Sequence, residues 1–479
     1  MKKLISHIIP SVSNAYRWMA CLFIALILTA CGDGGITAGE ETQTIAPRLL
    51  STSIPDGSTG LASTELDFTF TYSQSVTWSN VSAIEIENAT VKTTSADKNK
   101  LSLTLEALLE GHNYKLTIPT GVVKGLGEVD VEGFTLHFST KGDAPIEIKV
   151  PLATPNAMNQ AQLLYNYMNS IYGKQVLSGT MADVAWNVNE ANLVYHATGK
   201  YPAMTFFDYI HLPSSPCDWI DYSDITELEQ WWKQGGIIGI GWHWLVPVEE
   251  GSDEYSYTPG NGKHNADDVA TTKFRPANVM IEGTWENRVA KADLDEVTGY
   301  LRLLQDKGIP VVWRPLHEAA GNTYEYQGGT AWFWWGYDGG EVYRNLWRFM
   351  FNYLKDKGIN NLIWVWTTQL KDAEFYPGDD YVDIIGTDIY GKQSGENAAQ
   401  YTTITTEYPQ KPVALTECGR VGEVSDQWSK GAHWLYYMPW YHSGLTSLDN
   451  HREANTSWWL NAVGSEQVIT RDELPSFNP

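Results

Sequence analysis

The sequence predicts an α/β protein in which a (β/α)8 barrel follows a small all-β sandwich. The first observation behind this prediction is a change in the spacing of apolar residues along the chain. Short runs in residues 46–142 alternate apolar and polar residues, whereas those in residues 143–479 are apolar throughout. The second observation is a set of eight such apolar runs, separated by helical stretches. Eight β/α units over about 330 residues fit a barrel with long loops.

Residues 1–30 have the features of an export signal rather than of folded structure. Two lysines near the start precede an apolar run at residues 18–30, which is too short to span a bilayer because about 20 residues are needed. The run ends in "LTAC", which resembles the lipobox of bacterial lipoproteins and implies cleavage before Cys31 with lipid on its sulfur. We expect residues 31–45 to be a flexible tether. The mature protein would then be lipid-anchored in the bacterial outer membrane, at the cell surface or on the periplasmic face. An ordinary cleaved signal or a short anchor helix is the alternative.

Residues 46–142 have the pattern of a small β-sandwich. Runs such as "LDFTFTYS", "LSLTLEAL" and "FTLHFST" alternate apolar and polar residues between Gly, Asn, Asp and Ser, as half-buried strands do. The segment resembles the bacterial Ig-like domains found as spacers in surface proteins. It shows no cluster of aromatic residues that would make a sugar-binding module, so we expect a spacer.

The eight apolar runs of residues 143–479 predict strands buried on both faces, as in a parallel sheet. Amphipathic stretches at residues 159–171, 293–308 and 340–358 predict helices between them. The second and third of these end in a Lys-Gly pair, which is favoured at helix C-termini. An open doubly wound sheet is the alternative. It would more often show a glycine-rich nucleotide loop after its first strand, and "LSGTM" is not one. The runs are "KQVLSGT", "YPAMTFFDY", "GGIIGIGWHW", "IPVVWRP", "NLIWVWT", "VDIIGTDIY", "KPVALTE" and "AHWLYYMP".

Composition limits the classes of partner and cofactor. The formal net charge of −24 disfavours nucleic acid, because no basic patch is available to neutralise phosphates. The 21 Trp and 26 Tyr supply flat rings that pack in a core or stack on sugars. With Cys21 in the signal and Cys31 lipidated, Cys217 and Cys418 remain, and neither has a second cysteine at the spacing of a zinc site. We expect no metal, no cofactor and a monomeric protein.

In a barrel of this kind the chemistry lies where the strands end, at the C-terminal face. The fourth predicted strand runs into "VVWRPLHEAAGN" and ends at His317 and Glu318, and the seventh, "PVALTECG", ends at Glu417. A carboxylate at the end of an apolar strand is costly unless it is paired or used, so the two together indicate a two-carboxylate site. A zinc-protease helix is excluded, because Gly321 stands where its second histidine belongs and Pro315 opposes a helix. Other polar residues at predicted strand ends are Asp208, His243, Asp388 and Tyr390.

Three motifs together resemble glycoside hydrolase family 26, whose best-known members are endo-β-1,4-mannanases. They are "VVWRPLHEAAGN" with the following "AWFWWG", "GTDIYG" and "ALTECGR". The resemblance spans residues 147–479 and implies that Glu318 is the acid/base and Glu417 the nucleophile. The chemistry agrees, since a retaining glycosidase uses two carboxyl groups about 5–5.5 Å apart. Glu318 must be protonated near neutrality, which requires a partly apolar setting and a second negative charge nearby.

The resemblance also implies substrate-binding residues around this pair. Trp332, which opens "WFWWG", matches a tryptophan that forms the floor of the sugar site, and Tyr390 matches a tyrosine that orients the nucleophile. His317 occupies the position before the acid/base, where related barrel families usually have Asn. His243 matches a histidine-bearing strand end, so we expect it and Trp244 to contact the substrate.

Further expectations come from the residues themselves. Strand alternation places Arg314 on the same face as Glu318, where it would favour the ionised form of Glu417; a barrel-interior arginine with a structural carboxylate partner is the alternative. Trp440, after the eighth strand, is a candidate for stacking on a sugar. The sequence departs from the family pattern in "AAGNTYEYQGGT", a glycine-rich insertion of about seven residues after the glutamate that would reshape the site near the leaving group. It also departs at Cys418, which we expect to be a small buried thiol.

These residues predict a retaining endo-acting β-mannanase that hydrolyses internal β-1,4 linkages of mannan, galactomannan or glucomannan. Its partners would be these glycans and their oligosaccharides. β-1,3-Xylanase and mixed-linkage β-glucanase activities are the alternatives within the family. A non-catalytic, glycan-binding surface lipoprotein is the alternative from another class. Both glutamates argue against it, since a binding protein has no reason to keep both.

Overall fold

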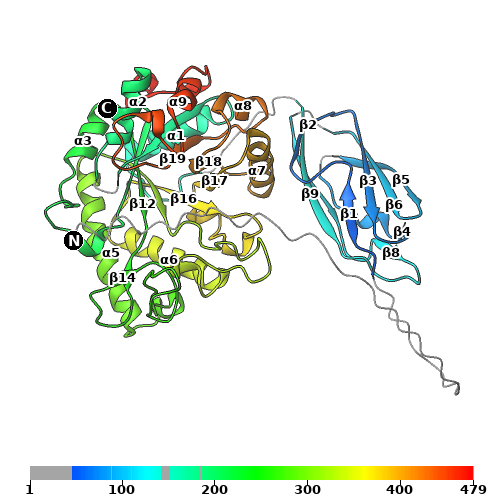
Figure 1. Ribbon diagram of the computed structural model, residues 1–479, viewed down its shortest axis with the longest axis horizontal. Helices are drawn as coiled ribbons and strands as arrows, with labels where there is room; N and C mark the ends of the chain where they lie inside the picture. The colour runs from blue at the N-terminus through cyan, green and yellow to red at the C-terminus, as the bar shows by residue number, and fades with distance from the viewer. Residues whose placement is uncertain (1–45, 88, 109–110, 142–150, 184–185, 478–479) are drawn as a thin grey trace.

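Figure 1 shows the computed structural model, which describes residues 46–87, 89–108, 111–141, 151–183 and 186–477. The expected signal peptide (1–30), the lipidated Cys31 and the tether (31–45) lie outside these residues, as does the expected domain boundary at residues 142–143. Within the described ranges, no helix combines the length and the apolarity needed to cross a membrane.

The N-terminal domain is a β-sandwich, as predicted. Alternate residues are buried along β3 and β6, and side chains such as Phe68, Phe70 and Leu103 form its core, because successive side chains of a strand point to opposite faces. One sheet has the order β1-β3-β6-β5 and another the order β2-β9-β7, while β4 pairs with β8. The strands are β1 (Leu49–Thr52), β2 (Ser58–Leu61), β3 (Glu65–Tyr72), β4 (Val76–Trp78), β5 (Thr90–Asp97), β6 (Lys100–Glu106), β7 (Asn113–Ile118), β8 (Val123–Gly125) and β9 (Phe134–Thr140).

The C-terminal domain confirms the predicted (β/α)8 barrel. Within the described residues, eight parallel strands follow the order β11-β12-β15-β16-β17-β18-β19-β10, and β10 pairs with β11 to close the barrel. Seven of them are buried at every residue, which explains why their sequences are apolar throughout. The strands are β10 (Val176–Met181), β11 (Met204–Asp208), β12 (Ile237–Trp242), β15 (Val311–Pro315), β16 (Leu362–Thr368), β17 (Ile384–Tyr390), β18 (Val413–Gly419) and β19 (Tyr436–Pro439).

Helices surround this barrel (Figure 1) and agree with the predicted amphipathic stretches, with one difference. Helix α5 begins at Trp285 rather than at the predicted Asp293, because the Thr284 side chain accepts a hydrogen bond from the Asn287 N–H and caps the helix. The helices are α1 (Asn159–Ile171), α2 (Asn189–Thr198), α3 (Thr226–Lys233), α4 (Pro276–Val279), α5 (Trp285–Asp306), α6 (Gly340–Asp356), α7 (Ser394–Glu407), α8 (Val424–Ser429) and α9 (Thr456–Val463). Short strands β13 (Val246–Pro247) and β14 (Tyr255–Ser256) form a hairpin after β12, and β20 (Val468–Ile469) adds to β10.

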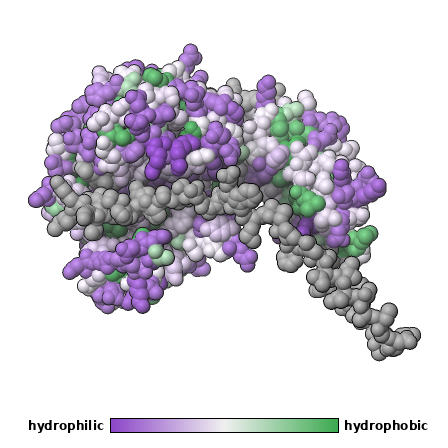
Figure 2. All heavy atoms as spheres, viewed as in Figure 1, coloured by the Kyte–Doolittle hydropathy of each residue, from purple (hydrophilic) through white to green (hydrophobic). Residues whose placement is uncertain are grey.

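The sandwich packs against helix α7 of the barrel (Figure 1). Asn113 on β7 donates a 2.7 Å hydrogen bond to Thr405, and Lys115 lies 3.2 Å from Glu407. Thr405 and Glu407 belong to the C-terminal end of α7, which precedes β18, so these contacts lie toward the end of the barrel opposite the strand C-termini. On the face seen in Figure 2, hydrophilic residues predominate over both domains and hydrophobic residues form small, separate areas.

Candidate active site

The chain turns abruptly where β15 ends, and this turn places Glu318 at the barrel mouth. Leu316 and Glu318 have φ angles of +50° and +49°, a left-handed conformation that is unfavourable for residues with a side chain. Two buried aromatic donors hold the turn: the Tyr343 hydroxyl donates to the Leu316 carbonyl and the Trp335 indole to the His317 carbonyl, both at 2.8 Å. Such backbone strain persists only where the surroundings fix it, and it is common at active sites.

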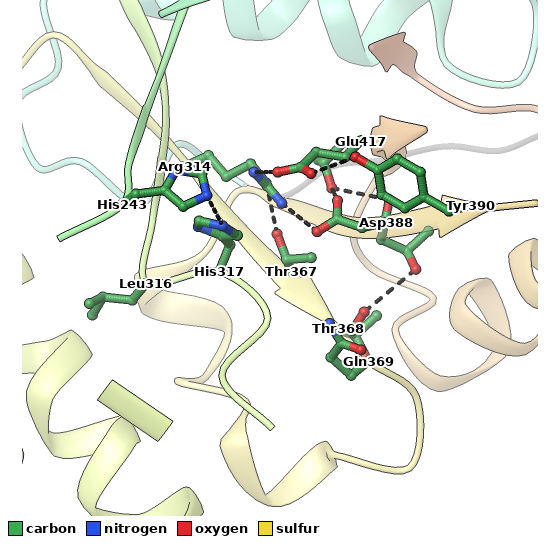
Figure 3. A network of polar contacts seen from close by, with 12 residues as sticks. His243, Arg314, Leu316, His317, Thr367, Thr368, Gln369, Asp388, Tyr390 and Glu417 are labelled. Carbon is green, nitrogen blue, oxygen red and sulfur yellow. Dashed lines mark hydrogen bonds and ion pairs between the residues drawn. The ribbon is translucent and has the colours of Figure 1, made fainter. Parts of the chain in front are cut away.

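Arg314 connects the other carboxylates of the site (Figure 3). It is 3% exposed, and its guanidinium donates to Glu417 Oε1 at 2.7 Å, to Asp388 Oδ2 at 2.5 Å and to Thr367 Oγ1 at 3.0 Å. The Tyr390 hydroxyl donates to the second oxygen of Glu417 at 2.9 Å. Both oxygens of Glu417 therefore accept hydrogen bonds, one of them from a cation, and these bonds fix the orientation of the carboxyl group.

Glu318 has the opposite surroundings. Burial raises its pKa well above the ordinary value, and the negative charges of Asp388 and Glu417 raise it further, against the opposing effect of Arg314. Burial also raises the pKa of Asp388 to about 7, although the Arg314 charge lowers it. Three carboxyl groups thus share one arginine, and Glu318 retains a proton at a pH where an exposed glutamate has lost it. The site therefore combines a carboxyl group that retains its proton, Glu318, with a second one, Glu417, that accepts hydrogen bonds at both oxygens.

A buried chain of hydrogen bonds lies beside the carboxyl groups. Asp208, at the end of β11, accepts from the His243 backbone N–H at 3.0 Å and from its Nδ1 at 2.6 Å. The His243 Nε2 atom lies 3.1 Å from His317 Nε2. At His243, burial acts to lower the pKa, but the Asp208 carboxylate outweighs burial and the pKa is raised. At His317, burial and the Arg314 charge both lower the pKa.

Two of the predicted substrate-binding residues are buried in the structure. His317 is 1% exposed and its Nε2 atom faces His243. Trp244 is fully buried, stacks on Trp242 at 4.1 Å and donates its indole N–H to Asp293. Both side chains are therefore packed inside the protein in this structure, and their contact with the sugar stays a prediction.

The other predicted aromatic residues lie at the surface of the site. Trp332 and Tyr390 are 39% and 37% exposed. Trp440 is half-buried, with its ring 5.8 Å from the His243 ring. Cys418 is buried, as predicted.

Sequence reasoning assigned no role to several residues that the structure brings into the site. Asp388 was recognisable only as a polar strand end, and its contact with Arg314 could not be foreseen. Tyr257 and Phe333 pack against His243, with ring centroids 6.1 Å and 6.0 Å away, but they come from loops whose path the sequence pattern does not predict. Within the described residues, no group of three or more His, Cys, Asp or Glu side chains is placed to hold a metal ion.

Both domains of the chain match known protein families. Residues 153–473 match the family described as glycosyl hydrolase family 26, and residues 43–140 match the bacterial Ig-like domain.

Similar proteins have been characterised from several organisms. The chain is 31% identical over 370 residues to mannan endo-1,4-beta-mannosidase A of Piromyces sp, covering 75% of this chain and 56% of that protein. It is 33% identical over 337 residues to a mannan endo-1,4-beta-mannosidase of Thermothelomyces thermophilus, covering 69% of this chain and 64% of that protein. The chain thus spans less than two thirds of the length of these curated relatives.

Solved structures show the same barrel. The GH26 domain of an endo-beta-mannanase/endo-beta-glucanase from Prevotella bryantii is 39% identical, with a TM-score of 0.60 over 69% of this chain and 99% of that one. A beta-mannanase from a symbiotic protist of the termite Reticulitermes speratus, solved with a gluco-manno-oligosaccharide, is 30% identical. Its TM-score is 0.60, and the match covers 70% of this chain and 100% of that chain.

Proposed function

This chain belongs to glycosyl hydrolase family 26, and from that premise we propose that it is a retaining endo-acting β-mannanase. Its substrates would be the internal β-1,4 linkages of mannan, galactomannan or glucomannan. The observation that carries the proposal is the pair of glutamates at the ends of β15 and β18. Glu318 has a raised pKa, and Glu417 accepts hydrogen bonds from Arg314 and Tyr390 at both oxygens. The names of the similar enzymes from Piromyces sp, Thermothelomyces thermophilus and Prevotella bryantii support the choice of mannan.

In the first step of the proposed reaction, Glu417 forms a bond to the anomeric carbon while the bond to the leaving-group oxygen breaks. Glu318 donates its proton to that oxygen, so the leaving sugar departs as a neutral alcohol. Positive charge develops on the sugar in this step, and the carboxylate of Glu417 stabilises it before the covalent bond is complete. Arg314 and Tyr390 hold the Glu417 oxygens and thereby orient the carboxylate for attack.

In the second step, the deprotonated Glu318 accepts a proton from water, and the resulting hydroxide forms the new bond to the anomeric carbon. The bond to Glu417 breaks, and both glutamates return to their starting states. Two inversions at the same carbon retain its configuration. Tyr390, whose hydroxyl bonds to Glu417, and Trp332, in the segment after β15, are exposed and would contact the sugar at the reacting position.

We also propose that the protein is exported, lipidated at Cys31 and anchored as a monomer in the outer membrane, with residues 46–142 as a spacer. The lipobox-like "LTAC" supports the anchor. Growth with a labelled fatty acid should label the wild-type protein, and Cys31→Ser should abolish the label. Label retained in that variant would refute the anchor.

The proposed activity is tested by reducing-sugar release from β-1,4-mannan, mixed-linkage glucan and β-1,3-xylan, with a chain that lacks residues 1–31. We expect release from mannan and loss of that release, by several orders of magnitude, in Glu318→Gln and Glu417→Gln. Both variants should still bind mannan, because the amide has the shape of the carboxyl group. Normal turnover in either variant would refute the assignment of the two glutamates. Sugar release from glucan or xylan alone would show that this glycan, and not mannan, is the substrate.

A further inference from the structure

The exposed aromatic rings of the barrel lie almost entirely at one face. Apart from Tyr195 on α2, every large aromatic side chain that is exposed in the described part of the barrel belongs to a segment at the C-terminal end of a strand. In the described part of the sandwich, the exposed large hydrophobic side chains are aliphatic. Single exposed apolar residues are ordinary, but this confinement to the face that carries the carboxyl groups is not. These rings are Trp219 after β11, Tyr255 after β12, Tyr326, Trp332 and Tyr337 after β15, and Tyr390 at the end of β17.

Tyr326 is the most exposed of these rings, at 58%, and it lies in the insertion that distinguishes this chain from the family pattern. The insertion begins directly after Glu318, whose carbonyl accepts a 3.0 Å hydrogen bond from the Gly321 N–H. The Asn322 side-chain amide donates a 2.6 Å hydrogen bond to the Tyr326 hydroxyl. The ring is therefore held close to the residue that follows this turn, on the acid/base side of the site.

The insertion is a closed and internally bonded loop. The Asn322 N–H donates to the Thr330 carbonyl at 3.2 Å, and the Thr330 N–H donates to the Asn322 side chain at 2.8 Å. Gly321, with φ +56°, lies so close to the returning chain that a Cβ atom would be 2.4 Å from the Thr330 carbonyl oxygen. At the far side of the loop, the Tyr324 hydroxyl bonds to Glu374 of the loop after β16. The Tyr326 ring is thus exposed to water on an ordered support.

An exposed ring that is already ordered loses little conformational entropy when a flat apolar surface stacks on it. The C–H face of a pyranose is such a surface. Glu318 must reach the leaving-group oxygen, so a segment that directly follows Glu318 in the chain is available to sugars on the leaving-group side. This segment is the insertion.

From these contacts, and on the basis of the proposed function, we propose that the insertion after Glu318 forms an additional sugar-binding subsite on the leaving-group side. The Tyr326 ring is its stacking surface, and Asn322 holds that ring in place. The subsite favours substrates with several sugars beyond the bond that is cleaved.

The test compares two substrates in the chain that lacks residues 1–31. Mannohexaose places several sugars on the leaving-group side, whereas an aryl β-mannobioside has one small aromatic leaving group. The quantity measured is the ratio of kcat/KM for the hexaose to kcat/KM for the aryl substrate. We expect this ratio to fall about tenfold in Tyr326→Ala, equivalent to about 1.4 kcal/mol of lost binding to the transition state. Tyr326→Phe, which keeps the ring, should lower it by less.

Tyr195→Ala is the matched control, because it removes an exposed tyrosine from helix α2 and should leave the ratio unchanged. An unchanged ratio in Tyr326→Ala, or an equal loss on both substrates, would overturn the subsite while leaving the proposed function intact. If the unaltered protein hydrolyses neither substrate, the proposed function itself fails, and the subsite with it.

Discussion

At the residue scale, Glu318 and Glu417 have the same side chain but different neighbours. Glu417 accepts hydrogen bonds from Arg314 and Tyr390, which orient its carboxyl group. Glu318 is half-buried beside Asp388 and Glu417, and desolvation together with these charges raises its pKa. Asp388 is consequently part of the machinery, because it adds a negative charge next to the acid without contacting the sugar in the proposed mechanism.

This role of Asp388 leads to a pH prediction. Activity on the alkaline side ends when Glu318 loses its proton, so the alkaline limb of kcat/KM follows the Glu318 pKa. Asp388→Asn removes a charge that raises this pKa, and the alkaline limb should therefore move to lower pH. The measurement is kcat/KM on mannohexaose as a function of pH.

The control for this experiment is Asp383→Asn, because Asp383 is a buried aspartate at the start of the same strand, bonded to the backbone of Trp364 and Ala153. Asp383→Asn should leave the alkaline limb of kcat/KM at the same pH, as measured on the folded part of the sample. An alkaline limb that stays in place, or moves to higher pH, in Asp388→Asn would show that Asp388 does not act on Glu318.

The sequence could predict these positions only in part. Polar residues after buried strands identified Glu318 and Glu417, because strand ends in such a barrel converge at one face. The burial of His317 could not be predicted, since the alternation of a strand ceases to apply once Leu316 and Glu318 adopt positive φ angles. The network around Arg314 joins residues from β15, β16, β17 and β18, and pairings over such separations leave no local pattern in the sequence.

At the element scale, the strands of the barrel were predictable and the loops were not. Strand β12, for example, is fully buried and its run "IIGIGW" is apolar throughout, so period and length alone identify it. The insertion after Glu318 contains Gly, Asn and Tyr without a period, and its folded path depends on bonds such as that between Asn322 and Thr330.

The stem of this insertion supplies a prediction about stability. Gly321→Ala places a Cβ atom against the Thr330 carbonyl in a left-handed conformation, and we expect it to lower the free energy of unfolding by about 1–3 kcal/mol or to open the loop. Thermal unfolding measures the first outcome. An open loop would lower the hexaose-to-aryl ratio of kcat/KM.

Gly299→Ala provides the comparison, because Gly299 lies inside helix α5 with open space at its Cβ position. This change should raise the free energy of unfolding by about 0.5–1 kcal/mol, since alanine favours the helix. If both substitutions behave alike, in stability and in the substrate ratio, the tight closure of the insertion is refuted.

At the scale of the whole molecule, the two domains meet away from the carboxyl groups. The sandwich contacts the C-terminal end of α7 through pairs such as Asn113–Thr405 and Lys115–Glu407, and Gly57 lies against Ala399 in the first half of the same helix. The exposed pair Lys115–Glu407 contributes little to stability. The sandwich is therefore placed to hold or space the barrel rather than to complete its site.

Deleting residues 46–142 should accordingly leave kcat/KM on mannohexaose within about twofold of the intact protein. The melting temperature of the barrel should fall by about 2–4 °C, the shift that 1 kcal/mol produces in a large domain, because α7 loses its contacts with the sandwich. Activity assays and thermal unfolding of the two proteins provide the comparison. Loss of activity in a barrel that remains folded would show that the sandwich does more than act as a spacer.

The central claim is that Glu318 and Glu417 act together in a double displacement. Proton NMR of the first products released from mannohexaose, recorded before mutarotation, tests it most directly. The account predicts that the new reducing ends appear as the β-anomer and later equilibrate, because two inversions restore the original configuration. Initial appearance of the α-anomer would mean that water attacks the sugar directly, and Glu417 would not be the nucleophile.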